Sequence, residues 1–130
     1  MVHTHHKGLK NPGRRQLRVA EIIRHSLAGL LQCVPMREHD RWIEVMITVT
    51  AVIMSPDLKQ ARVYVRGFHH QSLPQDWLKQ LRLARGSLRN GLNLDLKYTP
   101  SLHFVEDASF AYADRIESLI AEERDRYPEA

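Results

Sequence analysis

The chain has 130 residues, 43% of them hydrophobic, which is enough to bury one core and too few for two. No apolar run reaches the roughly 18–20 residues that a membrane helix needs, and residues 1–15 lack the apolar stretch of a signal peptide. The single cysteine, Cys33, excludes an internal disulfide and argues against a cysteine-based zinc site. These features predict one cytoplasmic domain with no membrane association.

The charges are unevenly distributed along the chain. The net charge is +4, but residues 106–130 hold eight acidic side chains against three arginines, which leaves a balance of +9 on residues 1–105. A field this segregated favours a polyanionic partner. A membrane surface is the rival to a nucleic acid, but a basic membrane helix would carry larger apolar anchors on its exposed side.

Residues 1–13 are polar and positively charged, and we expect them to form a flexible basic tail. The histidines of this tail, His3, His5 and His6, could bind a transition metal, but a mobile tail without a ligand is the simpler interpretation. The acidic and histidine residues at positions 38–40 have no complementary cluster elsewhere in the sequence. We therefore expect neither a metal nor a cofactor.

A first helix is predicted from about residue 14 to residue 34, where apolar side chains recur at helical spacing after an Asn-Pro pair. Pro35 ends this helix, and residues 35–42 are predicted to form a polar loop. Cys33 lies on the apolar side of the helix, so we expect it to be buried. The basic beginning of the helix could join a binding surface through three residues, Arg14, Arg15 and Arg18.

Residues 43–54 are mostly β-branched or apolar and are predicted to form a strand. A turn over residues 55–58, with proline and aspartate at its centre, leads to an alternating segment over residues 60–66, which completes an antiparallel hairpin. Arg62 and Arg66 share one face of the second strand. That face could meet either solvent or a ligand.

The most informative segment runs from Trp77 to Leu92 and is predicted to form a helix with Gly86 in its interior. Its apolar residues fall within roughly an 80° arc, which predicts a stripe facing the core. Because an interior glycine costs about 0.5–1 kcal/mol relative to alanine, Gly86 indicates a bend or a close approach by another backbone. Beside the apolar stripe lies a stripe of cations that suits a phosphate backbone and is also common on solvated helices: Lys79, Arg82, Arg85 and Arg89.

A short third strand over residues 102–105 and a last helix over residues 109–124 complete the predicted elements. His103 is expected to be a packed or edge residue, since neither a nucleophile nor a second base accompanies it. We therefore predict a single α+β domain over residues 14–124, in the order α-β-β-α-kink-α-β-α, with a three-stranded sheet packed against helices and a tail over residues 125–130.

This order of elements, with a broken helix pair after the hairpin, resembles a type II KH RNA-binding domain. In such domains a glycine-containing junction between two helices clamps a single-stranded backbone. The usual GxxG signature is absent here, and another tripeptide occupies the junction. The resemblance assigns the helix kink to Ala84, Arg85 and Gly86.

The chain resembles more specifically the bacterial ribosome-binding factor A family, whose KH-like fold has an Ala-x-Gly kink in place of GxxG. The most distinctive segment runs from TVTAV through SPDL to ARVYV. Lys97, where the family often has arginine, and a less acidic loop after this segment are departures from the family pattern. The resemblance covers roughly residues 14–120 and depends on four ordered segments: residues 18–23, 48–65, 84–89 and 98–104.

The resemblance implies a protein that is not an enzyme and that binds the immature 30S subunit. It also implies a role late in maturation, near the 5′ end of 16S rRNA and the decoding region, and a link to growth in the cold. The expected partner is 16S rRNA within the free 30S subunit, and the expected state is a cytoplasmic monomer. We expect seven cations to contact the RNA: Arg14, Arg15, Arg18, Lys79, Arg82, Arg85 and Arg89.

Three other functions stay open from the sequence. The first is a general binder of single-stranded RNA or DNA with a KH-like fold and no ribosomal role. The second is a small enzyme, which would need paired acid and base groups or an activated nucleophile that the sequence does not mark. The third is a protein-interaction module that uses a sheet edge or the last helix.

Overall fold

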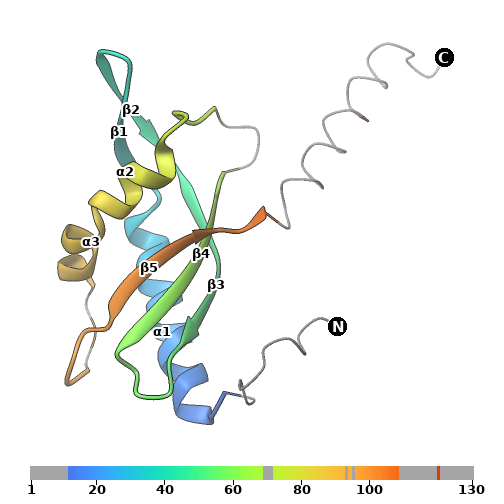
Figure 1. The fold of residues 1–130 in the computed structure, drawn as a ribbon, viewed down its shortest axis with the longest axis vertical. Helices are drawn as coiled ribbons and strands as arrows, with labels where there is room; N and C mark the ends of the chain where they lie inside the picture. The colour runs from blue at the N-terminus through green and yellow to red at the C-terminus, as the bar shows by residue number, and fades with distance from the viewer. Residues whose placement is uncertain (1–11, 69–71, 93, 95, 109–119, 121–130) are drawn as a thin grey trace.

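The computed structural model describes residues 12–68, 72–92, 94, 96–108 and 120. Within these residues the chain forms a mixed α+β domain of three helices and five strands (Figure 1). None of the described helices has the length and apolar character needed to cross a membrane. In chain order the elements are α1 (Arg14–Leu30), β1 (Val34–Glu38), β2 (Arg41–Val45), β3 (Ile47–Met54), β4 (Gln60–Gly67), α2 (Trp77–Leu83), α3 (Arg85–Gly91) and β5 (Ser101–Glu106).

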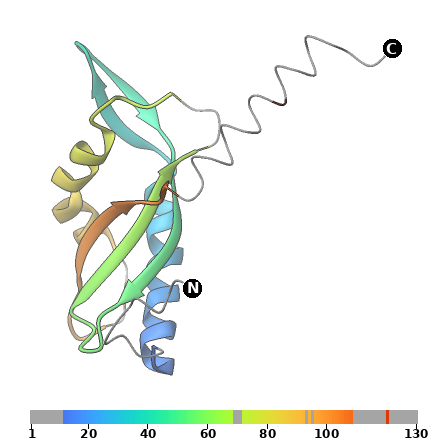
Figure 2. The ribbon, with the colours of Figure 1, turned by 45° about the vertical axis from the view of Figure 1, so that its right-hand side comes forward.

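Three strands form the main sheet in the order β3-β4-β5, with β4 in the centre. β3 and β4 are antiparallel, which confirms the predicted hairpin, whereas β4 and β5 run parallel. The parallel pair is connected through α2 and α3, which lie beside β5, while α1 lies behind β3 and β4 (Figures 1 and 2). This arrangement confirms the predicted α+β fold with a three-stranded sheet packed against helices.

One face of the sheet is buried against the helices and the opposite face is open. Residues of β4 alternate accordingly, because Ala61, Val63 and Val65 are buried whereas Arg62 is exposed. α1 contributes its buried stripe to the same core, and α2 contributes Leu81, which is fully buried. The helices are thereby held in fixed positions relative to β5.

The segment after α1 is not the polar loop that we predicted for residues 35–42. It forms a second, two-stranded sheet in which β1 and β2 pair antiparallel. The physical reason is the alternation of the ribbon, because apolar residues such as Met36 and Val45 are buried on one face while polar residues occupy the other. The strand predicted over residues 43–54 is accordingly divided at Met46 into β2 and β3.

α1 ends at Leu30, earlier than predicted, and Pro35 lies within β1. The helix ends there because Leu31 leaves helical geometry and its carbonyl accepts a hydrogen bond from the first N–H of β3, at 2.9 Å. Cys33, which we expected to be buried, is exposed in the link between α1 and β1. A hydrogen bond with the neighbouring Glu44 carboxylate raises the pKa of the Cys33 thiol, so the thiol stays protonated.

The predicted tails and the predicted last helix lie almost entirely outside the described residues, which omit residues 1–11, 109–119 and 121–130. The histidines of the N-terminal tail belong to this part. The predicted binding residues all lie within the described part.

Candidate nucleic-acid interface

The long helix predicted after the hairpin is broken at Ala84 into α2 and α3. Ala84 has φ −88° and ψ 1°, outside helical geometry, although its N–H still reaches the Gln80 and Leu81 carbonyls at 3.1 Å. The break therefore precedes Gly86, which has no left-handed backbone and whose added Cβ would meet no atom within 4 Å. Gly86 does not make the bend; it leaves exposed, unobstructed backbone at the start of α3.

Two of the predicted RNA-binding arginines bond to the backbone around β5. Arg82 donates from Nε and Nη2 to the Phe104 carbonyl, at 3.2 and 3.1 Å. Arg89 donates from Nε and Nη2 to the Thr99 carbonyl at 3.2 and 2.7 Å, and from Nε to the Pro100 carbonyl at 3.1 Å. These bonds join α2 and α3 to β5 and to the segment that enters it. They orient both guanidinium groups but do not neutralise their charge.

Lys79 and Arg85 belong to the same α2–α3 segment and have a different environment. Both side chains are exposed, and neither makes a hydrogen bond or ion pair with another described residue. Arg85 is the first residue of α3 and is therefore adjacent both to the break and to the open backbone of Gly86. A hydrated cation without an acidic partner is well suited to a phosphate oxygen.

The basic beginning of α1 is held in place by Gln16. Its Oε1 accepts the Gly13 N–H at 2.9 Å, and its Nε2 donates to the Met54 carbonyl, at the end of β3, at 3.0 Å. The first turn of α1 is thus fixed against the main sheet. Three exposed arginines at this point make no hydrogen bond or ion pair within the described part of the chain: Arg14, Arg15 and Arg18.

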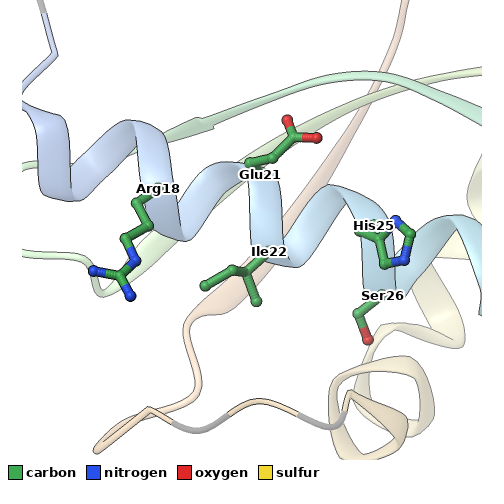
Figure 3. A pocket seen from close by; sticks show the side chains of 5 residues that line it. All are labelled: Arg18, Glu21, Ile22, His25 and Ser26. Atoms are coloured by element: carbon green, nitrogen blue, oxygen red, sulfur yellow. The ribbon is translucent and has the colours of Figure 1, made fainter.

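A shallow depression lies beside Arg18 on the exposed side of α1. In Figure 3, Arg18, Ile22 and Ser26 project toward the segment that follows α3, whereas Glu21 projects to the opposite side. Arg24 forms an ion pair with Glu21, and its hydrogen bond lowers the pKa of this carboxyl. Because Arg24 engages the carboxylate, Arg18 remains an unpaired cation among the described residues. Five residues line the depression: Arg18, Glu21, Ile22, His25 and Ser26.

The described residues contain no group of three or more histidine, cysteine or acidic side chains placed to hold a metal ion. His103 lies exposed on β5, an edge strand of the main sheet, with its Nε2 2.5 Å from Gln60 Oε1. This position agrees with the edge residue that we predicted. What the region offers chemically is a set of exposed cations on α1 and α2–α3, together with open backbone at Gly86.

Sequence analysis missed the residues that position these segments. Gln80 is one of them, because its Oε1 accepts the Arg37 N–H and its Nε2 donates to the Arg37 carbonyl, both at 2.8 Å. The same Nε2 also donates to Asp76 Oδ1 at 2.8 Å. Gln80 therefore joins α2 to β1. Neither Gln80 nor Gln16 shows a sequence signal, since a glutamine in a helix is usually solvated.

Comparison with known proteins decides the family. The model of the family described as ribosome-binding factor A matches residues 15–120 of the chain. The chain belongs to the ribosome-binding factor A family. Among relatives, the ribosome-binding factor A of Hyphomonas neptunium is 38% identical over 119 residues, which cover 88% of this chain and 87% of that protein. The predicted family is confirmed, and its members are described as ribosome-binding factors.

Solved structures of ribosome-binding factor A share the fold. The crystal structure of the factor from Thermus thermophilus aligns with a TM-score of 0.53 at 24% identity, over 70% of this chain and 93% of that chain. A homology model of the Thermus thermophilus factor, fitted into the cryo-EM map of its complex with the 30S subunit, aligns with a TM-score of 0.51 at 26% identity. This second alignment covers 67% of this chain and 89% of that chain.

Proposed function

We propose that this chain binds the immature 30S ribosomal subunit and assists the late maturation of its 16S rRNA, including processing of the 5′ end. The observation that carries the proposal is the family match over residues 15–120. A structural relative that was fitted into a 30S complex supports the choice of partner. On this proposal the chain acts in the cytoplasm as a monomer and by binding, without a catalytic step.

The contact surface that we propose is the exposed cationic side of α1 and of the α2–α3 segment. Lys79 and Arg85, with the arginines of the first turns of α1, meet rRNA phosphates, because their charges are exposed and have no acidic partner in the described residues. The absence of a side chain at Gly86 lets a sugar-phosphate backbone approach α3 closely. Arg82 and Arg89 contribute charge while they hold β5.

Phosphate contacts position a protein on RNA without reading its sequence. Selection of an immature subunit must therefore depend on the shape of the rRNA and on its surroundings in the particle. Such binding can favour one arrangement of rRNA helices over another, and it matters most in the cold, where misfolded helices persist. Cells that lack the chain should accumulate 16S rRNA with an unprocessed 5′ end at low temperature.

The contact surface is tested by reversing two charges together, Lys79→Glu with Arg85→Glu. If each contact contributes about eightfold at about 0.1 M salt, the loss of both weakens binding by at least about 50-fold. The measurement is co-sedimentation of purified protein with purified immature 30S particles over a series of salt concentrations. With about five phosphates neutralised, the wild-type log-log slope should be roughly −3.5 to −4.5, and the variant should lose about 1.5–2 units of it.

A matched control separates the location of the charges from their number. Lys59→Glu with Arg62→Glu changes the same residue types by the same net charge, at exposed positions on and beside β4. This control should bind nearly as wild type does. Undiminished binding by a folded Lys79 and Arg85 variant would refute the proposed surface. Equal wild-type affinity for random single-stranded oligonucleotides would favour the alternative of a general nucleic-acid binder.

A further inference from the structure

The β1–β2 ribbon presents an indole ring to solvent. Trp42 is 63% exposed, whereas the other tryptophan, Trp77, is 9% exposed and belongs to the core. An exposed tryptophan on a regular strand gains nothing from folding that a smaller side chain would not gain. Large aromatic side chains left at a surface are typical of binding interfaces.

The register of the ribbon places Trp42 directly opposite Arg37 on the exposed face. The Arg37 guanidinium carbon lies 5.3 Å from the centre of the Trp42 ring, which is a cation–π arrangement. Pro35 and Glu44 form the next pair on the same face. The exposed face is thus an aromatic ring and a guanidinium group in contact, with a proline and a carboxylate beside them.

The ribbon is held rigidly, although it projects beyond the main sheet (Figures 1 and 2). Its other face is anchored by Met36, which is fully buried, and by Val45. Gln80 of α2 bonds both the N–H and the carbonyl of Arg37 at 2.8 Å. The Trp42 and Arg37 pair is therefore presented in one orientation, which reduces the entropy lost when a partner binds.

The charge of this face distinguishes it from the proposed RNA-binding surface. Arg37 and Glu44 balance one another, and the guanidinium group of Arg37 already lies over the indole ring. RNA binding depends mainly on neutralising several phosphates, and a face without net charge cannot supply that term. Tryptophan and arginine at the centre of a nearly neutral patch are the residues that dominate binding energy between proteins.

We propose that the exposed face of the β1–β2 ribbon binds a protein component of the small ribosomal subunit, while α1 and α2–α3 contact its RNA. Trp42 enters an apolar pocket of that protein, and a carboxylate at the rim of the pocket accepts hydrogen bonds from Arg37, which has five donors. The inference rests on the proposed function, because the partner is taken to be part of the same particle.

Two variants test the inference on purified immature 30S particles. Trp42→Ala should weaken co-sedimentation by about 10- to 30-fold, as expected for a central aromatic anchor. The matched control is Ile53→Ala, which removes an exposed apolar side chain, 49% exposed, from β3, and it should bind as wild type does. In a second protein a photoreactive benzophenone amino acid replaces Trp42. On irradiation of the complex it should form an adduct with a protein of the subunit, identified by mass spectrometry after nuclease treatment.

Each outcome decides between supporting and overturning the inference. Adducts with rRNA would assign the ribbon to RNA, adducts with a second copy would assign it to self-association, and the absence of adducts would leave no protein partner; all three overturn it. Wild-type affinity of Trp42→Ala overturns it as well. If Trp42→Ala disturbs the ribbon, the benzophenone protein still keeps an aromatic ring at that position. Failure of the wild-type chain to bind the particles would instead refute the proposed function, and this inference with it.

Discussion

Two pairs of cations on the α2–α3 segment have the same charge but different surroundings. Arg82 and Arg89 bond to carbonyl groups of β5 and of the segment that enters it. Lys79 and Arg85 are exposed and have no hydrogen-bond or ion-pair partner among the described residues. The first pair therefore contributes to the stability of the fold, and the second pair is available to a partner.

This difference teaches that a stripe of cations on a helical wheel is not by itself a binding surface. All four residues fall on the same side of a predicted continuous helix, and nothing in their order distinguishes them. The distinction arises because β5 approaches α2 and α3 and offers backbone carbonyls to two of the four. Arginine suits that role, since its planar fork donates two hydrogen bonds at once.

The largest expected effect on stability comes from removing the pair that faces β5. Arg82→Ala with Arg89→Ala should lower the free energy of unfolding by about 2–4 kcal/mol, because hydrogen bonds from a charged donor to partly buried carbonyls are lost. Urea denaturation followed by circular dichroism measures this change. Lys79→Ala with Arg85→Ala should stay within about 0.5 kcal/mol of wild type. Equal losses in both double variants would contradict the distinction between the pairs.

A smaller effect, of opposite sign, is expected at Gly86. Its backbone is helical and a Cβ would have open space around it, so Gly86→Ala should raise the free energy of unfolding by about 0.4–1 kcal/mol. Binding to 30S particles should weaken nonetheless if an RNA backbone approaches this position. Thermal unfolding and co-sedimentation of the same protein measure the two changes. A lower melting temperature would show that the glycine makes the break in the helix after all.

The smallest effect extends the comparison to α1, where Arg24 is paired with Glu21 and Arg18 is unpaired among the described residues. Glu21→Gln removes a negative charge one turn from Arg18 and should strengthen binding to 30S particles by about twofold at moderate salt. Arg24 keeps the pKa of Glu21 below its ordinary value, so the carboxylate is charged and the gain should be constant across neutral pH. Weaker binding by the variant would show that Arg18 does not face RNA.

Local sequence pattern predicted most of the regular elements correctly. The β3–β4 hairpin was predictable because β-branched residues flank a turn of suitable composition, and α1 was predictable from the spacing of its apolar residues. The β1–β2 ribbon was missed because Arg37, Glu38 and the residues of its turn suggest a loop. Its buried face holds only a few apolar residues, and their alternation is meaningful only when the two strands pair.

The candidate site divides in the same way. The list of cations could be written from the sequence, and so could the position of the broken helix, through the resemblance to the family. The bonding of Arg82 to Phe104 could not, because it joins residues 22 positions apart through a backbone carbonyl, which every residue possesses. Gln80, which bonds β1 from α2, was missed for the same reason.

What the sequence by itself determined is the family, the α+β class and the excess of positive charge, since these follow from residue identity and from periodicity along the chain. Only the tertiary structure decided which cations face solvent and which hold β5, where Trp42 is displayed, and that the helix breaks before Gly86. These features depend on contacts between distant segments. The parallel pairing of β4 with β5 brings those segments together, and no local pattern specifies it.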